Sequence, residues 1–152
     1  NADNAYLADL VQPYFDEAGI KVQDQTYLEK IIGITKERCI LLPDFITQAG
    51  FYFAAPTQID TASIAPKWDD NKKNFFEALC VAFENSNTTD PLQLENIFKE
   101  LTATHSLKPG ELMLPMRIML VGGKFGPAVF EIAATIGISD AVTRIKHALT
   151  LL

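Results

Sequence analysis

An all-α fold of two packed helical subdomains is the fold class that this sequence predicts. Apolar residues recur at three- and four-residue steps along most of the chain, which is the period of an amphipathic helix. No stretch sustains the period-two alternation of a half-buried strand. Helix-start signals precede several periodic segments, including Pro43 before Asp44 and the pair Asp90-Pro91.

The first periodic segment predicts a helix over 7–18 that ends at Gly19, a residue suited to a helix C-cap. Pro13 lies inside this pattern and is expected to kink or divide the helix. The apolar positions that define the segment are Leu7, Leu10, Val11, Tyr14, Phe15 and Ala18.

Three more helices are expected in the first third of the chain. Asp24 is placed to cap a helix that ends near Gly33, because its side chain accepts from free backbone N–H groups. Thr35 is expected to cap a short helix that runs to Leu41, and a further helix is expected over 44–53.

Residues 54–68 are interpreted as a connector, because Pro56 and Pro66 flank a stretch rich in Thr, Ser and Ala. We therefore expect two subdomains, 1–57 and 58–152, in a chain whose 152 residues suffice for one domain or two small packed ones.

Beyond the connector, Asp69 or Asp70 is expected to start a helix that carries Phe75, Phe76, Leu79, Cys80 and Phe83. Asp90-Pro91 starts the next helix, and Lys108-Pro109-Gly110 interrupts the pattern. Residues 112–121 fit either a buried strand or a helix by pattern alone. Two final helices, 127–136 and 139–152, are expected to meet at Gly137, with Ser139 as the N-cap of the second.

Composition is that of a globular protein with a core, since 48% of residues are apolar and 21% are charged. The net charge of −6 argues against a generic nucleic-acid binder, which is usually basic. The charge is polarised, however, because residues 105–152 carry five Lys and Arg against three Asp and Glu. No apolar run reaches the length of a membrane span, and no signal peptide opens the chain, so a cytoplasmic protein is expected.

No catalytic or metal site is expected. His105 and His147 lack the spacing of a zinc site, and they are interpreted as surface or helix-end residues. Cys39 and Cys80 have no CxxC neighbour, so they are expected to be buried thiols. There is no GxSxG motif, and the carboxylates are dispersed on helical faces.

The stretch Val121-Gly122-Gly123-Lys124-Phe125-Gly126-Pro127 precedes an expected helix. Glycines in that position expose backbone N–H groups to a flat or anionic ligand, although a plain turn between helices explains them equally well. The stretch lacks the GxxxxGK[ST] order of a phosphate-binding loop, which argues against a nucleoside triphosphate site.

Two arginines stand in apolar surroundings. Arg117 lies between Pro115-Met116 and Ile118-Met119, and Arg38 precedes an apolar run. A guanidinium in such a setting snorkels, pairs, or faces a ligand. Its rigid fork of donors suits base edges, but a structural ion pair is the alternative that pattern alone favours.

Together these residues resemble a known family. Residues 115–122 (PMRIMLVG), 126–132 (GPAVFEI), Gly137 and Arg144-Ile145 resemble the C-terminal signature of bacterial-type glutamyl-tRNA synthetases. Upstream, residues 10–15 (LVQPYF) with Ala18-Gly19, then Tyr27-Leu28, Lys36-Glu37-Arg38 and Phe51-Tyr52-Phe53, are similar to the preceding part of that family in the same order. The resemblance covers nearly the whole chain.

The resemblance implies an α-helical cage that binds the anticodon arm of tRNA(Glu). Subdomain 1–57 would contact the anticodon stem and subdomain 58–152 the anticodon itself. It implies that Arg38 reads the third anticodon base, C in glutamate tRNA and G in glutamine tRNA, and that Arg117, Gly126 and Val129 approach neighbouring bases. It also makes residues 112–121 helical. Single-stranded bases are indeed recognised by arginine planes and backbone N–H groups.

The parent enzyme of such a region joins glutamate to tRNA(Glu) with ATP and Mg²⁺. The HIGH-like and KMSKS-like motifs for this reaction are absent from the sequence, so a monomeric recognition domain without cofactor or catalytic residues is expected. Asn1-Ala2 is interpreted as a cleavage remnant.

Three positions depart from the family pattern. Val121 stands where a hydroxyl residue is usual, Gly126 where threonine is frequent, and Ile138 where a basic residue is common. These departures concern how bases are read.

Two alternative functions remain open from the sequence, namely a helical protein-interaction module without RNA binding and a small stand-alone enzyme.

Overall fold

The computed structural model describes residues 3–39 and 41–152, and in these ranges every regular element is helical. The predicted all-α class is therefore confirmed. The chain divides into two compact units, Asn1–Ala54 and Ala55–Leu152. The pair Asn1-Ala2 lies outside the described residues. No helix among the described residues is long and apolar enough to cross a membrane.

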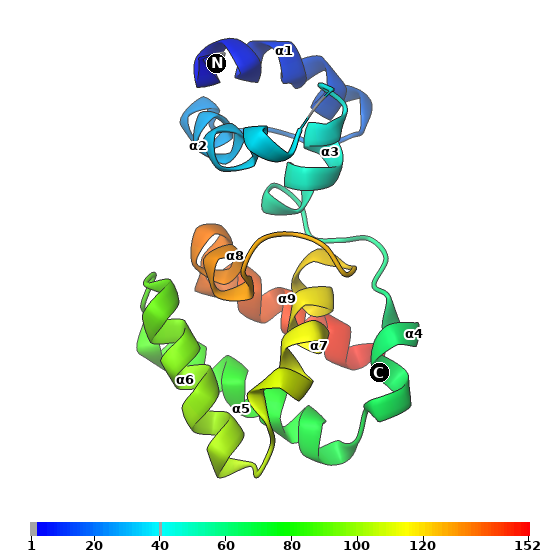
Figure 1. Ribbon diagram of the computed structural model, residues 1–152, viewed down its shortest axis with the longest axis vertical. Coiled ribbons are helices and arrows are strands. Elements are labelled where there is room, and N and C mark those ends of the chain that lie inside the picture. Colours follow the sequence, from blue (N-terminus) through cyan, green and yellow to red (C-terminus); the bar gives the residue numbers. More distant parts are fainter. Residues whose placement is uncertain (1–2, 40) are drawn as a thin grey trace. The chain divides into compact units, whose positions relative to one another are not determined.

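The first unit packs three α-helices around one core (Figure 1). They are α1 (Asn4–Glu17), α2 (Gln25–Thr35) and α3 (Asp44–Ala49), and 3-10 turns η1 (Lys36–Arg38) and η2 (Gly50–Tyr52) follow α2 and α3. The helices are amphipathic at the expected period, and their apolar faces meet in the core. Its fully buried apolar side chains are Ala8, Val11, Phe15, Leu28, Ile31 and Ile32.

Local signals in this unit are only partly confirmed. Asp24 caps α2 as expected, since its carboxylate accepts from Thr26 N–H at 2.9 Å. Pro13 does not divide α1, which is one continuous helix. The predicted cap at Thr35 is wrong, because this buried hydroxyl donates to the Ile31 carbonyl, 2.8 Å away, inside α2. α2 consequently runs past Gly33, and a 3-10 turn replaces the short helix expected after Thr35.

The second unit is a bundle of longer helices (Figure 1). Within it α5 packs against α6 and α9, α8 packs against α6, α7 and α9, and α4 contacts α7. The elements are α4 (Thr61–Ile64), η3 (Ala65–Lys67), α5 (Asp70–Ser86), α6 (Pro91–Thr104), α7 (Pro109–Val121), α8 (Val129–Ile136) and α9 (Ile138–Thr150). Residues 112–121 are thus helical, as the resemblance implied.

Aromatic rings join three of these helices. Phe75 on α5 meets Phe98 on α6 edge to face at a centroid distance of 5.2 Å. Phe98 in turn meets Phe130 on α8 at 5.3 Å. Such edge-to-face pairs are favoured by the ring quadrupole in addition to the apolar area they bury. The start of α8 is therefore tied directly to the core.

Helix starts in this unit follow the sequence only in part, because α4 begins at Thr61 inside the expected connector and α8 begins at Val129 instead of residue 127. Asp69 caps α5 through Lys72 N–H at 2.9 Å, and Asp90 caps α6 through Leu92 N–H at 3.0 Å. The expected cap at Ser139 is wrong, because α9 already begins at Ile138 with Gly137 as the N-cap. Gly137 has φ of +94°, a conformation that L side chains rarely adopt, and it turns the chain sharply between α8 and α9.

Candidate functional site

The loop 122–128 joins α7 to α8 in the second unit and begins at a tightly packed glycine (Figure 1). Gly122 has φ of +93°, and a Cβ there would lie 2.6 Å from the Gln58 carbonyl oxygen and 2.8 Å from Pro56 Cβ. The Gly122 carbonyl accepts from Asp60 N–H at 3.0 Å. Because no side chain fits, glycine is required where segment 56–60 holds the loop.

Arg117 holds the other end of this loop. Its Nη1 donates to the carbonyl oxygens of Phe125 at 3.1 Å, Gly126 at 2.9 Å and Pro127 at 2.5 Å. The guanidinium makes no ion pair with a described carboxylate, so three backbone dipoles surround Nη1 in place of a counter-ion. The structural ion pair that sequence pattern favoured for Arg117 is therefore absent from the described residues, and the arginine instead braces the loop.

Gly126 and Val129 lie within this same braced segment. Gly126 has φ of +101°, and its carbonyl oxygen accepts a hydrogen bond from Arg117. Val129 is only 4% exposed, so its side chain belongs to the core. Val129 is the first residue of α8, so the group it can present to a ligand is its backbone N–H. The N-cap residue Ala128 supplies no side-chain acceptor for the first N–H groups of the helix. Those groups carry the positive end of the helix dipole, which suits an electron-rich partner.

Lys124 and Phe125 were not singled out from the sequence, and the structure exposes both in the braced loop. Phe125 is 39% exposed, and Lys124 is exposed beside it. A cation next to an exposed ring is the combination on which single-stranded bases stack. The order glycine, lysine, aromatic, glycine is the sequence signal that would have marked these residues.

Arg38 belongs to the first unit and differs from Arg117 in its surroundings. It ends the 3-10 turn η1, it is exposed, and its guanidinium has no hydrogen bond or ion pair with a described residue. All of its donors are therefore available to a ligand. The structure brings together Arg117, Gly126 and Val129, and it presents Arg38 separately.

The third arginine, Arg144, is structural. It is 2% exposed, pairs with the Asp140 carboxylate at 3.0 Å, and donates through Nη1 to the Leu120 carbonyl on α7 at 2.8 Å. These bonds satisfy a buried guanidinium inside the bundle. Arg144 therefore fixes α9 against the helix that carries Arg117.

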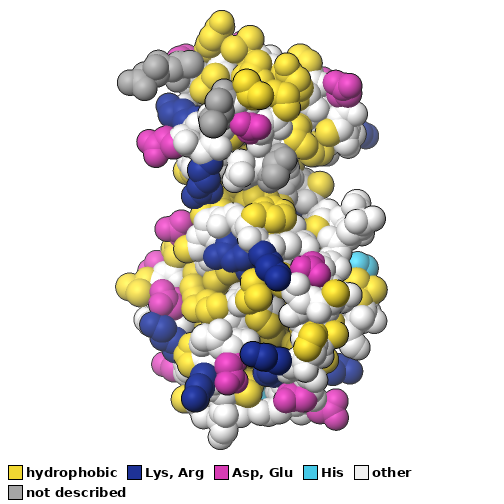
Figure 2. Space-filling view, turned by 45° about the vertical axis from the view of Figure 1, so that its right-hand side comes forward, with side chains coloured by type: hydrophobic (Ala, Val, Ile, Leu, Met, Phe, Trp, Pro, Cys, Tyr) yellow, Lys and Arg dark blue, Asp and Glu magenta, His cyan; other side chains and the backbone are white. Residues whose placement is uncertain are grey.

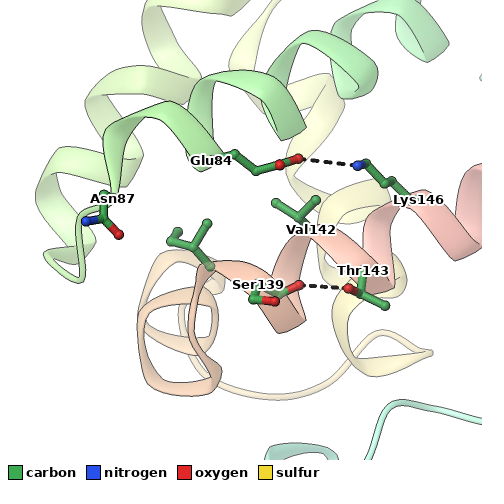
Figure 3. Close-up of a pocket in the computed structure, with 7 residues that line it drawn as sticks. Glu84, Asn87, Ser139, Val142, Thr143 and Lys146 are labelled. Atoms are coloured by element: carbon green, nitrogen blue, oxygen red, sulfur yellow. Dashed lines mark hydrogen bonds and ion pairs between the residues drawn. The ribbon is translucent and has the colours of Figure 1, made fainter.

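No group of His, Cys, Asp and Glu among the described residues is able to hold a metal ion. The depression drawn in Figure 3 lies between α5 and α9 and is lined by both polar and apolar side chains. Lys146 pairs with Glu84 at 3.3 Å, and the Thr143 hydroxyl donates to the Ser139 carbonyl at 2.8 Å. Acidic and basic side chains are also interspersed on the face shown in Figure 2.

Thiol reactivity gives a direct check on the packing. Cys80 is buried, and burial raises its pKa to about 11, whereas Cys39 is half-buried with a pKa raised by burial and by the nearby Asp44 carboxylate. The expectation that both thiols are buried therefore holds for Cys80 only.

Because the thiolate is the reactive form, we expect an aromatic disulfide reagent at pH 8 to modify Cys39 at least about tenfold faster than Cys80. The Cys80→Ala variant should keep the fast phase and the Cys39→Ala variant should lose it. Equal rates in the folded chain would contradict this packing.

Comparisons with known proteins define the class of the fold. The family model described as an anticodon binding domain matches residues 6–149. The chain therefore belongs to the family of anticodon-binding domains. This agrees with the helical architecture and with the resemblance noted in the sequence.

The similar proteins are glutamate–tRNA ligases. The ligase of Christiangramia forsetii is 28% identical over 151 residues, which cover 99% of this chain and 30% of the relative. That of Syntrophotalea carbinolica is 31% identical over 146 residues, covering 96% of this chain and 31% of the relative. A crystal structure of a glutamate tRNA ligase from Elizabethkingia meningosepticum in complex with its amino acid superimposes with a TM-score of 0.82 at 26% identity, covering 99% of this chain and 30% of that one. The chain thus spans about 30% of the length of such relatives.

Proposed function

We propose that this chain is the anticodon-recognition part of a glutamate–tRNA ligase and binds tRNA(Glu) as a monomer in the cytoplasm. The observation that carries the proposal is the braced loop 122–128, which groups Arg117, Gly126 and the start of α8 in one segment. The whole enzyme would ligate glutamate to the tRNA with ATP and Mg²⁺. We assign no residue of this chain to ATP, to the metal ion or to the ligation step.

Recognition would combine backbone and side-chain donors. Nη1 of Arg117 is occupied by the loop carbonyls, while no hydrogen bond to a described residue occupies Nη2 or Nε. These remaining donors suit a base edge or a phosphate, and the first N–H groups of α8 suit base acceptors. Phe125 would stack a splayed base, and Lys124 would face a phosphate.

Arg38 would read the third anticodon base. No described residue bonds to its donors, and a guanidinium fork pairs with the acceptors of a base edge. The unit Asn1–Ala54 would contact the anticodon stem, and the unit Ala55–Leu152 would hold the anticodon. The sequence placed this boundary after residue 57, three residues beyond the division between the compact units.

The alternative, a protein-interaction module, receives less support. Its signature would be a contiguous exposed apolar patch. The most exposed large apolar side chains lie instead on separate segments, namely Leu41 before α3, Leu92 on α6, Tyr6 on α1, Val81 on α5 and Leu151 after α9.

A measurement of tRNA binding distinguishes anticodon recognition from the protein-interaction alternative. Affinity of the chain for tRNA(Glu) and tRNA(Gln) should be measured over a series of salt concentrations. We expect the chain to prefer tRNA(Glu) at every salt concentration. The slope of the logarithm of the binding constant against the logarithm of the salt concentration should correspond to only a few phosphate contacts, because few cations are available. Equal affinity for both tRNAs, or no affinity at low salt, would refute the proposal.

Substitution of Arg38 gives a sharper test on two anticodon hairpins that differ only in the third base, C or G. Arg38→Ala should reduce the preference for C by about 1–3 kcal/mol, since a bidentate contact to a base edge is lost. Lys21→Ala removes an exposed cation from the same unit and serves as the matched control. It should weaken both hairpins equally. An Arg38→Ala variant that retains the full preference would exclude Arg38 as the reader.

A further inference from the structure

A groove of about 440 Å³ lies in the second unit, against the first half of α7. The loop 122–128 leaves the other end of that helix (Figure 1). Ile64, Leu114 and Pro115 form apolar walls, and Trp68, Lys72 and Glu111 contribute polar groups. This volume falls within the range of small-molecule sites, which combine apolar walls with a few polar groups.

Lys72 is the unusual member of this lining. Its side chain belongs to the first turn of α5 and is 8% exposed, yet it forms no ion pair with a described carboxylate. The ammonium donates to the Lys67 carbonyl, which leaves two of its three N–H donors without a described partner. A buried ammonium without a counter-ion is costly, so an anion that enters the groove would be stabilised there.

Trp68 supplies a second unused donor. One face of its half-buried indole stacks on Phe76 at a centroid distance of 5.9 Å and an interplanar angle of 22°. The indole N–H makes no hydrogen bond with a described residue and is not buried, so it is accessible to a ligand. The groove thus combines two unused donor groups with an apolar wall.

We propose that this groove binds a small monocarboxylate whose body is apolar, of the size of a phenyl or branched alkyl group. The carboxylate would accept from Lys72 Nζ and from the Trp68 indole N–H, and the body would contact Ile64 and Leu114. The lining carries two lysines, Lys67 and Lys72, and one carboxylate, that of Glu111. Two positive charges and one negative charge leave a single positive charge, which matches one carboxylate better than a phosphate or a second anionic group.

The chain carries its own reporter, because Trp68 is its one tryptophan. Phenylpropionate titrated into the chain should change the tryptophan fluorescence saturably, and the neutral phenylpropionamide should bind at least about tenfold more weakly. Lys72→Met should weaken phenylpropionate about tenfold or more while keeping the apolar stem. Glu111→Gln should strengthen it. Lys73→Met removes the neighbouring exposed lysine, which does not line the groove, and should leave binding unchanged.

Several results would overturn the proposal. These are an unsaturable fluorescence change that free N-acetyltryptophanamide reproduces, equal binding of the acid and the amide, or equal effects of Lys72→Met and Lys73→Met. Thermal melts will show whether Lys72→Met is folded, and Glu111→Gln provides the independent test if it is not. Displacement of phenylpropionate by a single-stranded RNA would make the groove an RNA contact instead. A peptide ending in phenylalanine that binds more than tenfold tighter would make it a peptide site.

Discussion

Replacing Arg117 with alanine is expected to weaken tRNA(Glu) binding by about 3 kcal/mol, roughly a hundredfold in Kd. Two losses add up. The carbonyls of Phe125, Gly126 and Pro127 lose their common donor, so the loop is no longer held for recognition. The Nη2 and Nε donors, to which no described residue bonds, disappear as well. Fluorescence anisotropy with a labelled anticodon hairpin would measure the affinity.

Arg117→Lys separates the two losses. A lysine ammonium is able to donate to the loop carbonyls, but it lacks the planar fork that pairs with a base. We therefore expect near-native backbone chemical shifts for residues 122–131, together with reduced discrimination between bases. In Arg117→Ala these shifts should change and the discrimination should be lost. Lys124→Ala, which leaves the brace intact, should weaken all hairpins uniformly. An alanine variant with unchanged chemical shifts in the loop would show that Arg117 does not position it.

Truncating Phe98 to alanine is expected to lower the free energy of unfolding by about 3–5 kcal/mol. The ring is fully buried and touches Phe75 on α5 and Phe130 on α8, so its removal leaves a cavity where three helices meet. Small domains are stable by only about 5–15 kcal/mol, so this loss consumes much of the total. Urea unfolding followed by Trp68 fluorescence reports on the same compact unit.

Leu92→Ala is the matched control, because Leu92 lies on the same helix but is 63% exposed. Its effect should stay within about 0.5 kcal/mol. Since Phe130 belongs to the first turn of α8, Phe98→Ala should also reduce RNA affinity at temperatures where the folded population falls. A loss below 1 kcal/mol would mean that the three helices repack without the ring.

Local signals were informative wherever the chemistry lies within one turn of the chain. Asp24, Asp69 and Asp90 cap helices because each carboxylate reaches an N–H two or three residues ahead. Thr35 and Ser139 carry suitable hydroxyl groups but do not cap. At Thr35 burial directs the hydroxyl back to Ile31, and at Ser139 the turn at Gly137 starts the helix one residue earlier. Both outcomes depend on packing beyond the local sequence.

Apolar periodicity and capping residues predict the helical class and the starts of α2, α3, α5 and α6, and the resemblance points to the anticodon-binding family. Periodicity, caps and the order of motifs are local or linear properties of the chain. The differences between the arginines come from tertiary contacts, since Arg144 is buried against Asp140, Arg117 braces a loop and Arg38 is exposed. It also assigned the Val129 side chain to the core. The partners of a guanidinium and the burial of a side chain arise from residues distant in sequence, and periodicity does not encode such contacts.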